Sequence, residues 1–595
     1  MMPGEKAKNF KGTMRRLVRY LSRYLPAMIA MMVFAAASTI FAVVGPRILG
    51  SATTQLFEGV VAQLTGTGSI DFSAIARILI FLAFVYLVSA LLSYVQALVM
   101  NRISVKISYE MRRDISQKIN RLPLAYFDRV SHGEVLSRIT NDVDTVTQTL
   151  NQSMSQIVTS VIQFIGVLVM MCTISPLMTL AALCMMSLSF WIVRRMVKLS
   201  QPFFKKQQAY LGEINGHVEE MYGGHLVVSA FNGEEKSIEN FEEINNRLYD
   251  VSWKSHFISG NMMPLMNFVG NLSYVVICVL GSLLSLHGQI TVGDIQAFVE
   301  YVRNLTHPIQ QIANISNVLQ QTAAAAERVF NFLEEPEETP DPENPLPADL
   351  IKGEVAFAHV HFGYTPEKTI IHDFSAIIEP GKKVAIVGPT GAGKTTIVKL
   401  LMRFYDVDSG AILLDGYDLR QFRRNDLRSQ FGMVLQDTWL YNASILENIR
   451  YGRLDATDEE VIAAAKAAQV DHFVHTLPQG YHTELNEEAS NISQGQKQLL
   501  TIARTIVSNP KILIFDEATS SVDTRTEVSI QKAMDHLMEG RTSFIIAHRL
   551  STIRDADLIL VMRDGDIVET GRHEELLKKG GFYAELYQSQ FAGVN

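Results

Sequence analysis

Long uncharged apolar stretches in the first 330 residues constrain this chain more than any other feature. A helix needs roughly 20 apolar residues to cross the hydrocarbon core of a bilayer. Stretches of that kind cover residues 25–46, 78–100, 157–193 and 258–286. The third is broken by Ser175 and Pro176 and is long enough for two spans, so five spans result. Because buried helices of this length rarely cluster in one half of a soluble protein, we predict a membrane-spanning first half.

Lysine and arginine are unevenly distributed along this half and indicate its orientation. Seven precede the first span, and eight lie in each of the segments 102–138 and 194–254. Internal loops of membrane proteins carry the excess of basic residues, so the N-terminus and both segments are predicted to be cytoplasmic. Both segments keep a helical apolar spacing. We therefore expect the membrane helices to continue as paired rods, with short elements at their tips near 124–128 and 222–227.

A proline-rich acidic segment separates this half from the rest. Residues 334–347 hold five prolines among acidic residues, a composition that supports neither a helix nor a central strand. We predict a membrane domain over 1–330, a solvated linker over 331–350 and a soluble α/β domain over 351–595. The net charge of -8 argues against nucleic acid as a partner. The three cysteines lie in apolar stretches, which excludes a disulfide scaffold.

The second half contains a glycine-rich motif of the phosphate-binding kind. A β-rich run, 384–387, leads into Gly-Pro-Thr-Gly-Ala-Gly-Lys-Thr at 388–395, which is the P-loop pattern between a strand and a helix. Glycines let backbone N–H groups converge on phosphate oxygens, and the helix offers its positive N-terminus. Lys394 is expected to reach the β- and γ-phosphates, and Thr395 to bind Mg²⁺. The predicted ATP-binding residues of this loop are Gly388, Pro389, Thr390, Gly391, Ala392, Gly393, Lys394, Thr395 and Thr396.

A second apolar run, 511–515, ends in two acidic residues. Asp516 at the carboxyl end of this strand suits Mg²⁺ coordination, directly or through water. Glu517 is placed to polarise an attacking water as a general base. Because a P-loop precedes this run in the same half, the two acids predict an ATPase rather than a solvated strand end.

A cytoplasmic ATPase requires an even number of crossings, so a sixth span must follow the five apolar ones. Its candidate is 293–319, which Asp294, Glu300 and Arg303 interrupt. Polar groups in a membrane segment indicate a face turned to a water-filled cavity or to partner helices. Three roles are possible for Glu300: it could contact a cation, form an ion pair with Arg303, or be a solvated acid at a helix end. Candidate polar residues of such a cavity are Gln152, Gln156, Asn267, Asn271 and Glu300.

Taken together, these motifs resemble those of ATP-binding cassette exporters of the half-transporter type. Asn-Ile-Ser-Gln-Gly-Gln at 491–496 is similar to the cassette signature, and Ser-Ser-Val-Asp at 520–523 to the D-loop. His548 resembles the switch histidine, Gln436 the Q-loop residue and Tyr364 the aromatic that stacks on adenine. Tyr-Phe-Asp at 126–128 resembles the first intracellular loop. The resemblance covers nearly the whole chain and implies an all-α six-helix transmembrane domain of the type IV exporter fold, followed by an α/β P-loop ATPase domain.

The resemblance also implies a mechanism that needs two half-transporters. Two cassettes meet head to tail, and each ATP lies between the P-loop of one and the signature of the other. Gln436 would join Thr395 and Asp516 at the Mg²⁺, and His548 would act with Glu517 in catalysis. ATP favours the closed dimer, so its binding and hydrolysis shift the cavity between inward- and outward-facing forms. Residues assigned to the partner's ATP or to the D-loop are Ser493, Gln494, Gly495, Gln496 and Asp523.

The signature departs from the usual Leu-Ser-Gly-Gly-Gln in two places. Ile492 replaces leucine, Gln494 replaces the first glycine, and the preceding loop, 485–490, lacks the usual glycines. One interpretation is tolerated drift in a homodimer. The other, which we favour, is a heterodimer in which this signature faces a degenerate site on the partner, since a bulky glutamine stands where glycine permits close approach.

The cargo is less constrained than the energy source. We expect ATP-driven, multidrug-like export of hydrophobic or amphipathic compounds from a multi-pass position in the cell membrane, in contact with lipid. Clustered methionines suit promiscuous apolar binding, although lipid-facing methionine is the more common case. The alternatives are a homodimeric lipid flippase and, in another class, an ATP-sensing regulator or gated channel. Glu517 and His548 argue against the latter, because they supply hydrolytic groups.

Overall fold

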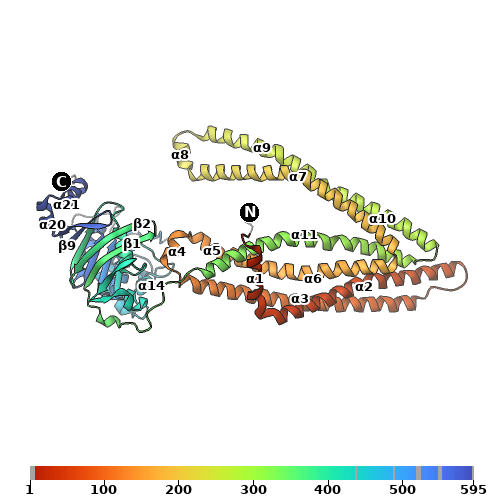
Figure 1. Ribbon diagram of the computed structural model, residues 1–595, viewed down its shortest axis with the longest axis horizontal. Coiled ribbons are helices and arrows are strands. Elements are labelled where there is room, and N and C mark those ends of the chain that lie inside the picture. The colour runs from red at the N-terminus through yellow and green to blue at the C-terminus, as the bar shows by residue number, and fades with distance from the viewer. Residues whose placement is uncertain (1–6, 436–437, 487–488, 517–523, 547–552, 592–595) are drawn as a thin grey trace. The chain divides into compact units, whose positions relative to one another are not determined.

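The computed structural model describes residues 7–435, 438–486, 489–516, 524–546 and 553–591. Two compact units emerge: Met1–Ile119 with Gly133–Glu335, and Asn120–His132 with Pro336–Asn595. The first unit is helical, and the second is built on two β-sheets (Figure 1). The segment 120–132, which lies between two long helices in the sequence, thus belongs to the sheet-containing unit.

The first unit consists of long helices with short elements at their ends. Its helices are α1 (Phe10–Leu21), α2 (Leu25–Leu64), α3 (Phe72–Ile119), α5 (His132–Ser137), α6 (Val143–Ile174), α7 (Pro176–Gly223), α8 (His225–Ala230), α9 (Glu234–Gly260), α10 (Met262–Leu286) and α11 (Val292–Glu334). Helices α2, α3, α6 and α11 pack on one another, whereas α7 pairs with α9 and α10 (Figure 1). Five helical segments among the described residues are long and apolar enough to cross a membrane. The sixth, α11, has 43 residues but a more polar sequence, as predicted.

Local sequence explains where these helices break. Pro176 opens α7, where a missing N–H costs nothing, and the Ser175 side chain accepts a hydrogen bond from the backbone of Met178 at 3.4 Å. The predicted break between two spans is therefore confirmed. Thr291 and Asp294 form a capping box at the start of α11, so Asp294 serves as a helix cap. The predicted tip elements are present as α4 (Leu124–Arg129) and α8.

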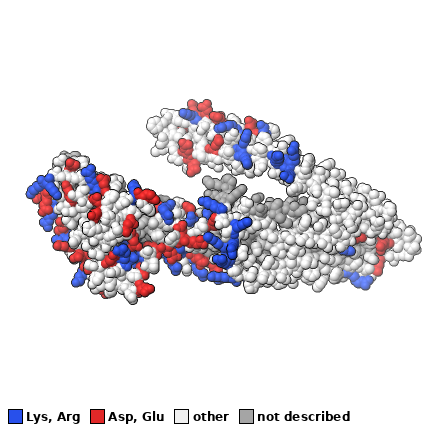
Figure 2. Space-filling view, viewed as in Figure 1, with Lys and Arg blue, Asp and Glu red and all other residues white. Residues whose placement is uncertain are grey.

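Glycines and buried polar groups hold α2, α6 and α11 together. At the crossing of α2 and α11, a Cβ on Gly293 would lie 1.8 Å from the carbonyl oxygen of Gly50, so the two backbones touch. Tyr301 is buried and donates to the carbonyl of Val43 at 2.9 Å. The buried carboxylate of Asp142, at the start of α6, accepts from Arg328 Nε at 3.0 Å. Charged side chains are sparse along the middle of the long helices and gather on the α7–α9 arm (Figure 2).

The second unit places a parallel sheet at its centre. Its strands are β1 (Val355–Thr365), β2 (Lys368–Ile378), β3 (Lys383–Val387), β4 (Ser409–Leu414), β5 (Tyr417–Asp418), β6 (Phe431–Val434), β7 (Ile512–Asp516), β8 (Thr542–Ile546), β9 (Leu558–Arg563) and β10 (Asp566–Gly571). The order β10-β9-β3-β8-β7-β6 is parallel except for the antiparallel edge strand β10. The other sheet, β2-β1-β4-β5, is antiparallel.

Helices cover the central sheet and complete two apolar cores. The remaining helices are α12 (Lys394–Leu401), α13 (Arg424–Arg428), α14 (Ile445–Arg450), α15 (Asp458–Ala467), α16 (Asp471–Val474), α17 (Gln494–Ser508), α18 (Thr524–Met538), α20 (His573–Lys579) and α21 (Phe582–Phe591). One core lies between the central sheet and α14, α15, α17 and α18, and the other between the two sheets and α12. Strands β3, β7 and β8 are buried on both faces, which explains their continuous apolar sequence.

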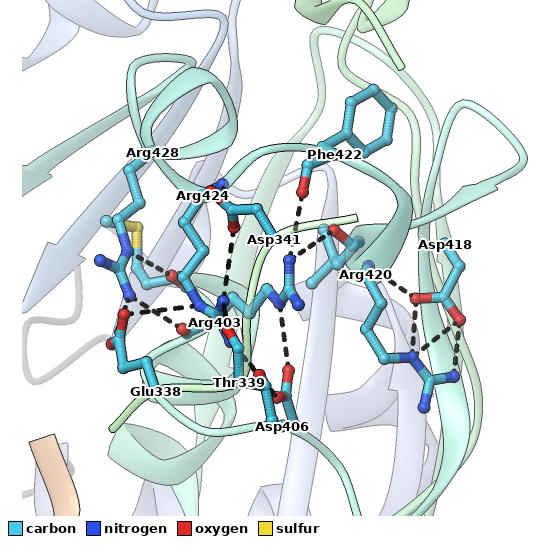
Figure 3. Close-up of polar contacts among 12 residues, drawn as sticks. Glu338, Thr339, Asp341, Arg403, Asp406, Asp418, Arg420, Phe422, Arg424 and Arg428 are labelled. Atoms are coloured by element: carbon cyan, nitrogen blue, oxygen red, sulfur yellow. Dashed lines mark hydrogen bonds and ion pairs between the residues drawn. The ribbon is translucent and has the colours of Figure 1, made fainter. Parts of the chain in front are cut away.

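The linker is anchored to the second unit, which the sequence did not predict. The buried Arg424 of α13 donates to the Thr339 backbone and side chain and pairs with Asp341 at 3.4 Å (Figure 3). Arg428 binds Glu338 at 3.2 Å, and the backbone N–H of Glu338 donates to the carbonyl of Arg121 at 2.9 Å. The linker is thus extended, as its prolines predict, but two of its carboxylates, those of Glu338 and Asp341, are paired with arginines.

Candidate functional site

The predicted P-loop joins β3 to α12 and has the geometry of a phosphate cradle. Gly391 and Gly393 adopt φ angles of +86° and +97°, a left-handed backbone that glycine takes without steric cost. At Gly388, a Cβ would lie 2.3 Å from the carbonyl oxygen of Met562, so only glycine fits. The loop therefore leads in a tight turn into the N-terminus of α12, and the N-terminus of a helix stabilises bound anions.

Lys394 begins α12 and turns back over the loop. The residue is 8% exposed, and its ammonium donates to the carbonyl oxygens of Gly388 and Pro389 at 2.8 and 3.0 Å. Burial lowers the pKa of Lys394, and the negative charge of Asp516 acts in the opposite direction. Strands β3 and β7 flank β8 in parallel, which brings Lys394 and Asp516 to the same edge of the sheet. The P-loop and the first acid of the second motif are thus brought together, as predicted.

The other P-loop residues differ in exposure. Thr390 and Thr395 are exposed, whereas Ala392 and Thr396 are buried beneath the loop. The Thr396 hydroxyl lies 3.3 Å from the hydroxyl of Tyr364, at the end of β1. An exposed hydroxyl at Thr395 and a carboxylate at Asp516 are hard oxygen ligands of the kind that Mg²⁺ accepts beside phosphate oxygens.

Tyr364 lies in a small aromatic cluster beside α12. Its ring is 5.1 Å from the rings of Phe362 and Tyr405, in edge-to-face geometry with each. The ammonium of Lys399 lies 5.5 Å from the Tyr364 ring centroid, within the range of a cation–π interaction. Tyr364 is 43% exposed, so ring surface is left for a further stacking partner.

Helix α4 docks on the same cluster through Asp128. Its carboxylate accepts from Lys399 Nζ at 3.0 Å and from the Tyr405 hydroxyl at 2.6 Å. Burial raises the pKa of Asp128, but the bonds from Tyr405 and Lys399 outweigh it, so the pKa lies below its ordinary value. Burial and the bond to Asp128 raise the pKa of Tyr405.

Sequence reasoning found Asp128 but not the residues that hold it. Lys399 and Tyr405 follow the P-loop in an apolar stretch, 396–405, whose pattern predicts a core-facing helix and gives no sign of a polar contact. A single charged residue carries no signal of a partner some 270 positions away in the chain. Only the tertiary structure shows that the segment 120–132 contacts the end of α12.

The signature-like residues lie at the N-terminus of α17. Ser493 caps this helix: its backbone N–H donates to Gln496 Oε1 at 2.9 Å, and its hydroxyl accepts from the Gln496 backbone at 3.3 Å. Gly495 is buried, whereas the Gln494 side chain is exposed at the start of the helix. The glutamine side chain therefore projects from the N-terminal end of α17.

The loop before this helix contains a strained alanine. Ala489 is 2% exposed and has a φ of +49°, in the left-handed region that glycine favours. The predicted absence of glycine from this loop thus leaves an alanine in a conformation that glycine adopts at lower cost. Gln436, Glu517, Asp523 and His548, also predicted to act here, lie outside the described residues.

Known proteins match both units. Residues 28–309 match the family model "ABC transporter transmembrane region", and residues 371–520 match "ABC transporter". A "Fatty acid ABC transporter ATP-binding/permease protein" of Mycobacterium bovis is 46% identical, over 98% of this chain and 97% of its own length. An "ATP-dependent lipid A-core flippase" of Syntrophus aciditrophicus is 34% identical over 85% of this chain and 84% of its own length. A bacterial Atm1-family ABC exporter with ATP bound has a TM-score of 0.70 and 30% identity, covering 96% of this chain and 98% of that one.

Proposed function

The chain belongs to the ABC transporter family, as an exporter half-transporter that couples ATP hydrolysis to transport, and from this premise we propose its cargo and assembly. The cargo is hydrophobic or amphipathic, in the manner of a multidrug exporter. The assembly is a heterodimer with a second half-transporter, in which one ATP site is degenerate. The N-terminus and the ATPase domain are cytoplasmic, with the domains at 1–330 and 351–595 and the linker between them.

The proposed coupling between ATP hydrolysis and transport is supported by one observation, the docking of α4 on α12, the helix that follows the P-loop. Asp128 binds Lys399, and Lys399 lies over the ring of Tyr364, which is proposed to stack on adenine. One charged side chain therefore contacts both the nucleotide-facing aromatic and the loop that connects two membrane helices. A change in nucleotide occupancy alters the surroundings of Lys399 and hence the docking of α4.

The chemistry at the ATP site follows from the P-loop and the ends of the strands. The backbone of 388–395 and the ammonium of Lys394 bind the phosphates, and Glu517 and His548 orient and activate water. The oxygen ligands Thr395, Asp516 and Gln436 fit Mg²⁺, which supplies charge neutralisation to the phosphates when bound. The side chain of Lys394 is held over the loop by two carbonyls, so it must exchange these bonds for phosphate oxygens.

The heterodimer is supported by the two departures at the signature. Gln494 projects from the start of α17, where backbone should approach the partner's phosphates closely. Ala489 holds a left-handed conformation in the preceding loop, which makes that loop less favourable than a glycine-containing one. Both changes affect the site built on the partner's P-loop and leave this chain's own P-loop and Asp516 intact.

A homodimeric lipid flippase is the second candidate. It is favoured by the similarity to a protein named a lipid A-core flippase, and it would use two copies of the same altered signature. A regulator or channel that senses ATP without pumping has no observation in its favour.

Copurification and turnover decide between these assemblies. The full chain is expressed alone and together with candidate half-transporters, and the mass of the purified particle and its ATPase rate are measured in nanodiscs. The proposal expects full turnover only in a mixed particle, and Glu517→Gln in this chain to abolish it. A homodimer of this chain with full ATPase activity and amphiphile transport would refute the heterodimer.

A further inference from the structure

A polar cavity lies between two membrane helices of the first unit. It has a volume of about 190 Å³ and is bounded by α10 and α11. Its polar lining consists of Asn267, Asn271, Tyr274 and Arg303, and Met266 and Val299 contribute to its apolar wall. Two of these residues, Asn267 and Asn271, are cavity candidates from the sequence.

Arg303 carries the positive charge of this cavity and has no protein partner among the described residues. The guanidinium is exposed, and no described side chain or carbonyl forms an ion pair or hydrogen bond with it. Glu300 lies one turn earlier on α11 and forms no ion pair with Arg303 in the described part of the chain.

Arg303 lies well inside α11. It is 11 residues after Val292, the first residue of α11, which at 1.5 Å per residue places it about 17 Å along the helix. Charged residues in membrane segments mark sites for substrates or ions. Because no carboxylate among the described residues bonds to Arg303, its guanidinium is open to an anion from outside the chain.

The remaining lining limits what this anion is. A guanidinium presents a planar fork of donors that matches a carboxylate, and the amides of Asn267 and Asn271 add donors beside it. The cavity volume of about 190 Å³ is enough for a small headgroup and a few methylenes. At Gly270, which also lines the cavity, an added Cβ would meet nothing within 4 Å.

We propose that the α10–α11 cavity is a headgroup site for single-chain amphiphiles with a carboxylate, with Arg303 as the specificity-determining residue. The inference rests on the proposed function, since it names the class of cargo within the amphipathic compounds. Arg303 binds the carboxylate, the two asparagines complete its hydrogen bonds, and the apolar wall receives the first methylenes.

Binding of three probes of equal chain length tests this assignment. Dodecanoate, dodecanol and dodecyltrimethylammonium are titrated at pH 8 into the full protein in phosphatidylcholine nanodiscs, with empty nanodiscs as the blank. The acid is expected to bind most tightly. Arg303→Gln should weaken dodecanoate binding roughly 10- to 100-fold, the range for losing a charged hydrogen-bonding partner, and should leave dodecanol binding within about threefold. Arg303→Lys should retain most of the acid preference, because the charge stays.

Two further variants separate a local effect from a general one. Gly270→Leu fills the cavity and should weaken the acid and the alcohol alike. Arg77→Gln removes an exposed arginine of α3 that does not line the cavity and should leave all three affinities unchanged. Equal loss of acid binding in Arg77→Gln and Arg303→Gln would overturn the assignment, as would equal affinities of the wild type for acid and alcohol.

Transport distinguishes a failure of this inference from a failure of the proposed function. ATP-driven movement of dodecanol or the ammonium probe in proteoliposomes, without preference for the acid, would overturn the headgroup site and leave the exporter proposal intact. Hydrolysis of ATP without movement of any of the three probes would count against the proposed cargo class itself. Preferential movement of the acid, lost in Arg303→Gln, supports both.

Discussion

Replacing Tyr405 by phenylalanine removes one hydroxyl from the α4 docking site and leaves its ring packing in place. The hydroxyl donates to the Asp128 carboxylate at 2.6 Å, while the ring packs edge-on against Phe362 and Tyr364. Hydrogen bonds to charged groups contribute about 1.5–3 kcal/mol. Because the Asp128 side chain is 42% exposed, solvent screening reduces this to roughly 1 kcal/mol. The docked form of α4 should then lose about fivefold in population relative to the undocked form.

Hydrogen–deuterium exchange of the full protein in nanodiscs measures this change. Peptides covering 120–132 should exchange about fivefold faster in Tyr405→Phe, because exchange there requires α4 to leave its site. Tyr417→Phe is the matched control, since the Tyr417 hydroxyl makes no hydrogen bond within the described part of the chain and its ring contacts Phe422. Equal exchange of 120–132 in the two variants would refute the role of Asp128 in docking.

The same contact predicts a dependence on pH. The Asp128 pKa is held below its ordinary value in the docked state, because its bonds to Tyr405 and Lys399 outweigh burial. A depressed carboxyl pKa stabilises the docked form above the ordinary pKa of about 4, and this stabilisation is lost as the pH falls through the lowered value. The protection factor of 120–132, which is the intrinsic exchange rate at each pH divided by the observed rate, should therefore fall below about pH 4, less so in Tyr405→Phe.

Three further substitutions have defined outcomes. Ala489→Gly removes the strain of a left-handed alanine at φ +49°. The greater conformational entropy of glycine in the unfolded chain offsets part of this gain, so the ATPase domain should be stabilised by up to about 1 kcal/mol, seen as a rise of a few degrees in Tm. An unchanged or lower Tm would show that the loop is not strained. Arg424→Ala removes a buried arginine that binds the linker and leaves Glu338 without one of its partners, so we expect a loss of about 2–4 kcal/mol in denaturant unfolding. Arg453→Ala removes a partly exposed arginine that pairs with Glu460 and should cost under about 1 kcal/mol. Gly388→Ala places a Cβ against a backbone carbonyl and should weaken ATP binding at least tenfold by calorimetry; near-wild-type affinity would contradict the cradle geometry.

Hydropathy predicted the membrane helices well because their apolar runs exceed what a soluble fold requires. It did not show where they end: α2 continues to Leu64 and α3 to Ile119, since a helix that leaves the apolar region becomes polar without breaking. The weak sixth span has a physical reason, because Asp294 caps α11 and Arg303 lines a cavity. The polar residues that lower the hydropathy of this segment thus have two roles: Asp294 caps the helix, and Arg303 lines the proposed headgroup site.

The ATP site was predictable as far as its local motifs reach. A P-loop is a contiguous pattern whose glycines have local conformational reasons, so Gly391 and Gly393 could be placed from sequence. The linker contacts of Arg424 and the docking of Asp128 on Lys399 are pairings between distant segments, which no local pattern contains. The strained Ala489 was visible only as a missing glycine, and its backbone conformation required the structure.

ATP-dependent movement of an amphiphile across a sealed bilayer tests the central claim most directly. Wild-type protein, reconstituted with any copurifying partner, should accumulate dodecanoate in inside-out proteoliposomes only when ATP and Mg²⁺ are outside. Glu517→Gln should bind ATP with wild-type affinity and accumulate nothing. Equal accumulation by the two proteins, or ATP hydrolysis by the wild type with no accumulation of any amphiphile, would contradict the coupling of this ATPase to transport.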